Sequence, residues 1–328
     1  MLFHNAIAEL RKSAAVAGDA KGEGAARSSA TPTLCKAQRR GEDLFEHGAF
    51  GLAAGPAAAL FAALMLFAPV AQAAEKPIVV VSVLPQVFFV KQIAGDLVRV
   101  EALIPPGLAP DSYEPTLGQL KSISKAALYI KVGHPGIPLE QTWLKHLLAE
   151  GSAIELIDSS EGLPYLPDDP HVWVTPDYGR SMTRNITRAL IRLLPEHRAE
   201  LEHNQNSLLE SIDQLDAEIR QLLEPYAGQK FLVFHPAWGY FAQKYHLEQL
   251  AVEAHGKEPS PAELTRLIEL ARKNNLKTIF VQPQFSRAEA QTLARDIGAK
   301  LVWMDPLAED WLENLRQTAL ALQKALSA

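Results

Sequence analysis

The chain contains a single cysteine, Cys35, among its 328 residues. This cysteine lies in an N-terminal segment that we expect to be removed as a leader, which leaves the remaining chain without any. The absence excludes structural disulfides, thiolate metal sites and a cysteine nucleophile. It also leaves no cysteine after the leader that could carry a lipid, so no lipid anchor is expected.

Long hydrophobic runs are equally scarce, and only residues 49–70 are apolar over enough length to be considered for a membrane span. This run is rich in alanine and contains Pro56. It follows Arg39 and Arg40 and ends in the small-x-small pattern Ala71-Gln72-Ala73. The pattern predicts a secretory signal peptide cleaved after Ala73 and a soluble periplasmic protein. An uncleaved membrane anchor is the alternative, and the long segment before the run indicates either an extended leader or a later translation start.

Clusters of basic residues are absent from the chain after the leader, and the net charge of the whole chain is −6. These features argue against nucleic acid as a partner. Hydrophobic residues make up 48% and charged residues 21%, as in globular proteins, and the length allows two domains. No linker rich in Gly or Ser is present, so large free motions between domains are not expected.

Short apolar segments alternate with helical ones in the first half of the mature chain. We predict strands at 78–83, 97–104, 127–132 and 154–157, and helices at 88–95, 115–126 and 139–150. Apolar strands that alternate with helices indicate a parallel sheet covered on both faces.

The second half repeats this alternation after a helical stretch. We predict helices at 177–194 and 196–223, the second with one apolar stripe formed by Leu201, Leu208, Ile212, Leu215, Ile219 and Leu222. Strands then follow at 230–234, 247–252, 278–281 and 300–304, and helices at 238–244, 261–273, 287–297 and 310–325. The predicted fold is therefore α/β, with two lobes, each a four-stranded parallel sheet flanked by helices, joined by one long helix. The expected boundaries are a leader at 1–73, lobes at 74–194 and 227–328, and a linking helix at 195–226.

Two histidines and two aspartates follow predicted strands, two in each lobe: Asp111, His171, His235 and Asp305. Ligands of open parallel sheets bind beyond the carboxyl ends of the strands. Two imidazoles and two carboxylates suit a divalent metal, and the carboxylates would neutralise its charge. We therefore predict a metal site between the lobes.

Each of these residues also has a purely structural interpretation. Asp111 could cap the helix near Pro115, Asp305 could cap the helix after it, and His171 and His235 could be histidines satisfied by their neighbours. Four such coincidences at equivalent strand ends are less probable than one site. The remaining histidines of the mature chain lack this context: His134, His146, His197, His203, His246 and His255. Glu114, Glu253 and Glu258 are further carboxylates that are not assigned to the predicted site.

Six segments of the chain resemble, in order, the signatures of the zinc/manganese-type solute-binding proteins of ABC transporters. They are PDSYEPT at 110–116, DPHVW at 169–173, FHPAWGYF at 234–241, EPS at 258–260, FVQPQFS at 280–286 and MDPL at 304–307. The resemblance implies two lobes joined by a rigid helix, with one metal ion held between them. It also implies delivery of that metal to an inner-membrane permease powered by an ATPase. We expect a monomeric receptor, and no enzymatic activity because nothing in the sequence resembles a nucleophile paired with a base.

The resemblance matches His171, His235 and Asp305 to family ligands. Asp111 departs from it, because the family usually has His at this position, and Gln282 stands where Glu is common. A carboxylate at position 111 gives a set of metal ligands that resembles that of manganese receptors. A histidine at position 235, in contrast, resembles the zinc-binding members of the family. The expected metal is Zn²⁺, with Mn²⁺ or Fe²⁺ as alternatives. Other hypotheses are a secreted zinc-dependent hydrolase and a receptor for a chelate such as a siderophore or corrinoid.

Overall fold

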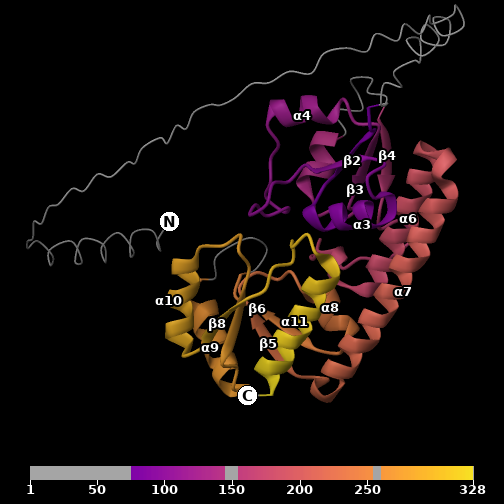
Figure 1. The fold of residues 1–328 in the computed structure, drawn as a ribbon. Coiled ribbons are helices and arrows are strands. Elements are labelled where there is room, and N and C mark those ends of the chain that lie inside the picture. The colour runs from indigo at the N-terminus through magenta and orange to yellow at the C-terminus, as the bar shows by residue number, and fades with distance from the viewer. Residues whose placement is uncertain (1–74, 145–153, 254–259, 328) are drawn as a thin grey trace, which may run out of the picture. The chain divides into compact units, whose positions relative to one another are not determined.

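The computed structural model describes residues 75–144, 154–253 and 260–327 (Figure 1). The predicted signal peptide and its cleavage site lie outside the described residues, as does the second half, 145–150, of the helix predicted at 139–150. Within the described ranges, no helix is both long and apolar enough to cross a membrane.

Two four-stranded parallel sheets form the framework, one in each half of the chain. Sheet A contains β1 (Ile78–Val81), β2 (Arg99–Ala102), β3 (Leu128–Lys131) and β4 (Glu155–Asp158), in the order β2-β1-β3-β4. Sheet B contains β5 (Lys230–Val233), β6 (Glu248–Ala251), β7 (Thr278–Val281) and β8 (Lys300–Trp303), in the order β6-β5-β7-β8. The identical order confirms the predicted repetition of one α/β pattern.

The helices are close to those predicted. They are α3 (Leu84–Ala94), α4 (Leu117–Ile123), α6 (Pro176–Leu193), α7 (Arg198–Leu223), α8 (Gly239–Lys244), α9 (Pro261–Lys273), α10 (Arg287–Ile297) and α11 (Trp311–Leu326). A five-residue π-helix, η1 (Leu139–Trp143), stands where an α-helix was predicted, and short 3₁₀ turns are η2 (Val172–Val174), η3 (Pro195–His197) and η4 (Glu224–Tyr226).

Helix α3 starts at Leu84, four residues before the predicted start. Pro85 sits in its first turn, where the missing N–H of proline costs nothing, and the Gln86 side chain accepts hydrogen bonds from the backbone N–H groups of Ser82 and Val83. Leu84-Pro85 therefore begins the helix rather than ending the strand region.

Helix α7 contacts helices from both halves of the chain. It packs against α3, which follows β1 of sheet A, and against α11, which follows β8 of sheet B. Its partner along the greatest length is α6, and Figure 1 shows α6 and α7 side by side. The predicted apolar stripe is buried, except that Leu223 rather than Leu222 completes it. The 26-residue α7 is about 39 Å long at 1.5 Å per residue, and it is the predicted long connecting helix.

The core is continuous along α7, over both faces of sheet A and over one face of sheet B. Phe231 and Val233 of β5 belong to this core, whereas Leu232, between them, belongs to a second apolar cluster under α9 and α10. This alternation is the two-residue period of a strand covered on both faces.

Candidate metal-binding site

His171 lies in the loop between β4 and α6 and is buried, with 2% of its surface exposed. Its Nδ1 lies 2.7 Å from Oδ1 of Asp169, and the same oxygen accepts a hydrogen bond from the His171 backbone N–H at 3.0 Å. A carboxylate beside Nδ1 holds the proton on that nitrogen, which leaves Nε2 with its lone pair. The loop thus holds the imidazole of His171 so that Nε2 is the nitrogen available to a metal.

His235 lies two residues after the end of β5 and is held in a similar way. Its Nδ1 lies 2.8 Å from Oε2 of Glu253. Its backbone is fixed by Gln282, whose side-chain oxygen accepts from His235 N–H and whose amide N–H donates to the His235 carbonyl. The ring also stacks on Phe285, with centroids 5.0 Å apart. Because Gln282 both donates and accepts, an ionised Glu at this position would lose the bond to the carbonyl.

His235 occupies the place where parallel sheets bind ligands. The order β6-β5-β7-β8 reverses between β5 and β7, and the loops after these two strands carry His235 and Gln282. Such a switch point leaves a crevice beyond the carboxyl ends of the strands.

Three of the four predicted residues come together. The rings of His171 and His235 meet edge to face with centroids 5.3 Å apart. Nε2 of His235 lies 3.7 Å from Oδ2 of Asp111. Residues separated by more than a hundred positions along the chain are thus neighbours, each from the carboxyl end of a sheet.

Asp111 does not cap the following helix. Thr116 does so, because its hydroxyl accepts a hydrogen bond from the Gln119 N–H at 3.3 Å. The structural alternative considered for Asp111 is therefore wrong, and its carboxylate is placed toward His235 instead.

Asp305 follows β8 and is half-buried. Its Oδ1 accepts hydrogen bonds from the Gln284 side chain at 3.0 Å and from the Leu307 backbone N–H at 2.9 Å. The cap of α11 is Asp310 rather than Asp305. Both bonds engage Oδ1, so Oδ2 of Asp305 keeps its capacity to bind a cation.

Two buried tryptophans connect the His171 loop to the Asp305 loop. The indole N–H of Trp173 donates to the carbonyl of Pro306, and that of Trp311 donates to the carbonyl of Trp173, both at 2.6 Å. Trp173 also meets the His171 ring at 5.3 Å between centroids. Rigid indole groups thereby hold the segment that carries Asp305 against the segment that carries His171.

The four side chains are not arranged in a chelating geometry. Among the described residues, no group of three or more His, Cys, Asp or Glu side chains is positioned to hold a metal ion. Asp111, His171 and His235 are neighbours, while the Asp305 carboxylate is hydrogen-bonded to Gln284 and Leu307. The four-ligand site stays a prediction.

The other histidines that the structure describes have ordinary roles. His134 is 1% exposed, and its nitrogens contact the Leu166 carbonyl and the Gly136 N–H, so it is a satisfied buried histidine. His197 pairs with Glu200 at the surface, and His203 is exposed. His146, His255 and Glu258 lie outside the described residues.

A buried carboxyl group that the sequence did not indicate lies at the switch point of sheet A. Glu140, in η1, accepts hydrogen bonds from the hydroxyl of Ser82 after β1 and from the backbone N–H groups of Val132 and Gly133 after β3. Burial raises the pKa of Glu140 to about 7, against the lowering effect of these hydrogen bonds and of Lys131. Tyr129 extends the network through Ser82, at 2.9 Å.

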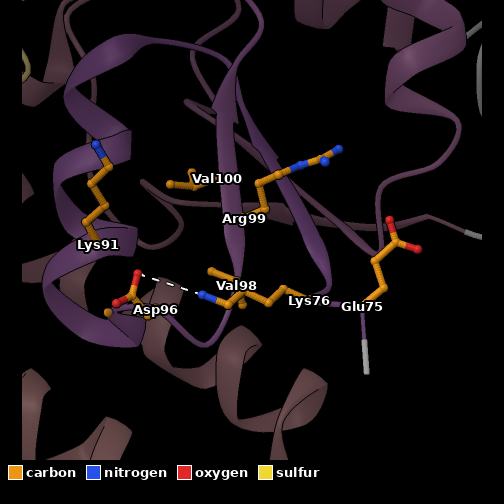
Figure 2. Close-up of a pocket in the computed structure, with 8 residues that line it drawn as sticks. Glu75, Lys76, Lys91, Asp96, Val98, Arg99 and Val100 are labelled. Atoms are coloured by element: carbon orange, nitrogen blue, oxygen red, sulfur yellow. Dashed lines mark ion pairs between the residues drawn. The ribbon is translucent and has the colours of Figure 1, made fainter. Parts of the chain in front are cut away.

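A cavity of about 630 Å³ lies away from all of these groups. Figure 2 shows its lining, which includes Lys76, Lys91 and Arg99 together with Glu75 and Asp96. Lys76 pairs with Asp96 at 3.8 Å, and both side chains are largely exposed. Surface charges of both signs around an open hollow do not form a metal site, and the cavity contains none of the predicted ligands.

Known proteins resemble this chain along almost all of its described length. Residues 79–325 match the family model described as "Zinc-uptake complex component A periplasmic". The high-affinity zinc uptake system protein ZnuA of Bacillus subtilis (strain 168) is 28% identical over 250 residues, which cover 69% of this chain and 77% of that protein. The manganese ABC transporter substrate-binding lipoprotein PsaA of Streptococcus anginosus is 25% identical over 249 residues, covering 68% and 79%.

The fold is shared with solved structures as well. A crystal structure of ZnuA superposes with a TM-score of 0.72 and 38% identity, covering 77% of this chain and all of that one. These comparisons give the hydrolase alternative no support.

Proposed function

Because this chain belongs to the family of periplasmic zinc-uptake complex components A, we propose that it is a receptor for a divalent transition metal. It would bind zinc by preference in the periplasm and deliver it to an inner-membrane ABC permease with its ATPase. The observation that carries the proposal is the meeting of His171 and His235 at 5.3 Å between ring centroids. Each ring has its Nδ1 on a carboxylate, which leaves both Nε2 atoms for a cation.

Asp111 and Asp305 would complete the ligand set. The Asp111 carboxylate is already beside Nε2 of His235, and Oδ2 of Asp305 is the oxygen that neither Gln284 nor Leu307 engages. Two neutral imidazoles and two carboxylates would leave a dipositive cargo electrically neutral in a buried place. Four protein ligands would fill the coordination sphere of zinc, so no position is left for the bound water that hydrolysis needs. We accordingly propose that the protein captures and releases metal without turnover.

The preference for zinc is supported by imidazole at 235 and by the zinc relative from B. subtilis. Manganese is the second candidate because Asp111 makes the donor set harder and because a manganese receptor is also similar to this chain. The Asp111→His variant would replace an oxygen ligand by a nitrogen. It is expected to increase the preference for zinc over manganese, measured as the ratio of the two dissociation constants.

The proposed route to the periplasm is the signal peptide at 49–73, with cleavage after Ala73. N-terminal sequencing of the exported protein tests this, because a chain that begins at Ala74 is expected. A chain that retains the apolar run would indicate a membrane anchor instead.

The metal site is tested by competitive zinc titration against a fluorescent chelator. His171→Ala and Asp111→Ala are expected to weaken zinc binding, the His variant by more than about 100-fold, since loss of a ligand exceeds the 10–100-fold typical of groups that only orient ligands. His134→Ala serves as the matched control, since both of its nitrogens already contact backbone groups. Unchanged affinity in both His171→Ala and Asp111→Ala would refute the site.

A further inference from the structure

The carboxylate of Asp169 receives hydrogen bonds from both halves of the chain. Its Oδ1 accepts from the backbone N–H and Nδ1 of His171, at 3.0 and 2.7 Å. Its Oδ2 accepts from the backbone N–H of Gly239, at 3.1 Å. Gly239 begins α8, four residues after His235, and Asp169 is 8% exposed. One buried group therefore touches the segments that carry the two candidate imidazole ligands.

The approach of α8 to this carboxylate requires glycine. A Cβ at position 239 would lie 2.5 Å from Oδ2 of Asp169, well inside the contact distance of a carbon and an oxygen. The backbone of α8 is thus close to Asp169 because residue 239 has no side chain.

We propose that Asp169 is a positioning residue that sets the imidazole of His171 and fixes it relative to the segment that carries His235. The inference rests on the proposed function, because it assigns Asp169 a role in metal binding. With Oδ1 as acceptor, the proton of neutral His171 stays on Nδ1, and Nε2 keeps the lone pair that a metal requires. Because its Oδ2 accepts a hydrogen bond from the Gly239 N–H, the same carboxylate also fixes α8 relative to the His171 ring.

Asp168 offers a matched comparison. It directly precedes Asp169 and is exposed, whereas the bonds to the His171 ring and to the Gly239 N–H come from Asp169. Asn at 168 therefore removes one negative charge beside the loop and leaves those bonds in place. Both oxygens of Asp169, in contrast, must accept hydrogen bonds.

Asparagine at 169 cannot satisfy both sides. If its oxygen faces His171, its NH₂ group opposes the N–H of Gly239 and the bond to α8 is lost. If its NH₂ group faces His171, Nδ1 must become the acceptor, the proton moves to Nε2, and the metal-binding lone pair disappears. Either arrangement should weaken metal binding although the side chain keeps its shape.

The test compares Asp169→Asn with Asp168→Asn in the mature protein with zinc alone. Chelator competition is expected to show zinc binding weakened about 10- to 100-fold in Asp169→Asn and unchanged in Asp168→Asn. The metal-free proteins give a second readout in ¹⁵N NMR of the histidine rings and of the Gly239 amide. Asp169→Asn should change either the His171 tautomer or the Gly239 N–H shift, while Asp168→Asn should change neither.

Gly239→Ala provides a second variant if Asp169→Asn folds poorly. Its Cβ would displace Oδ2 without changing any candidate ligand, and weaker zinc binding with an altered His171 ring signal is expected. If Asp169→Asn and Gly239→Ala bind zinc as the parent does, with unchanged ring signals, while His171→Ala loses zinc, the role of Asp169 is refuted and the site stands. If His171→Ala also binds normally, the site itself is wrong and the role of Asp169 falls with it.

Discussion

Raising the pH is expected to destabilise the metal-free protein through one buried carboxyl group, Glu140. Burial raises its pKa from 4.5 to about 7, in spite of hydrogen bonds from Ser82, Gly133 and Val132 that favour the ionised form. The folded protein thus binds this proton more tightly than the unfolded chain does. Between about pH 4.5 and about pH 7 the folded state holds more protons, so the free energy of unfolding falls as the pH rises through this window.

The magnitude follows from the two pKa values. A difference of one unit corresponds to about 1.4 kcal/mol, so the change from 4.5 to about 7 corresponds to roughly 3 kcal/mol. This contribution is fully present below about pH 4.5 and is lost above about pH 7. For a domain of ordinary stability it is a large fraction of the total.

Urea denaturation of metal-free protein at several pH values between about 5 and about 8 measures this effect. Glu140→Gln removes the titrating group, so its free energy of unfolding should change less with pH than that of the parent. The variant also carries a cost that does not depend on pH, about 1–3 kcal/mol, because its NH₂ group must oppose one backbone N–H. Glu161→Gln, at an exposed position, is the control and should keep the pH dependence of the parent.

The outcome is decided by how steeply the free energy of unfolding changes with pH, and not by its value at any one pH. If Glu140→Gln and the parent lose stability in parallel as the pH rises, Glu140 does not titrate in this window and the reasoning from its burial is refuted.

Ser82→Ala removes one hydrogen bond that favours the ionised Glu140, so the pH at which stability is lost should move upward in the same denaturation series. Gly179→Ala places a Cβ 2.5 Å from the Trp311 ring and should lower the free energy of unfolding by about 1–3 kcal/mol in urea. Gly118→Ala, whose Cβ would meet only a hydroxyl at 3.9 Å, should leave stability unchanged or raise it by up to about 1 kcal/mol. Equal effects of the two glycine substitutions would contradict the packing assigned to Trp311.

Local signals in the sequence were sufficient to predict much of the fold. Helix α9 has the predicted bounds because Ser260 caps it and Glu263 returns the hydrogen bond three residues later. The β-branched runs predict the strands to within two residues. The start of α3 was wrong because this helix is buried along most of its length, so no amphipathic stripe marks where it begins.

The candidate ligands could be found from the sequence because each follows a strand. The groups that hydrogen-bond to these ligands were harder to predict from the sequence. Asp169 stands two residues before His171 with a proline between them, a local signal that could have indicated its hydrogen bonds. Glu253 and Glu140 contact residues 18 and 58 positions away, and only the paired strands bring them together.

A zinc-edge anomalous difference map from crystals of the zinc-loaded mature protein tests the central claim most directly. We expect one strong peak bonded at about 2.0–2.1 Å to Nε2 of His171 and of His235, with carboxylate oxygens of Asp111 and Asp305 at about 2.0–2.2 Å. A peak elsewhere on the molecule, or one that lacks either imidazole, would contradict the account.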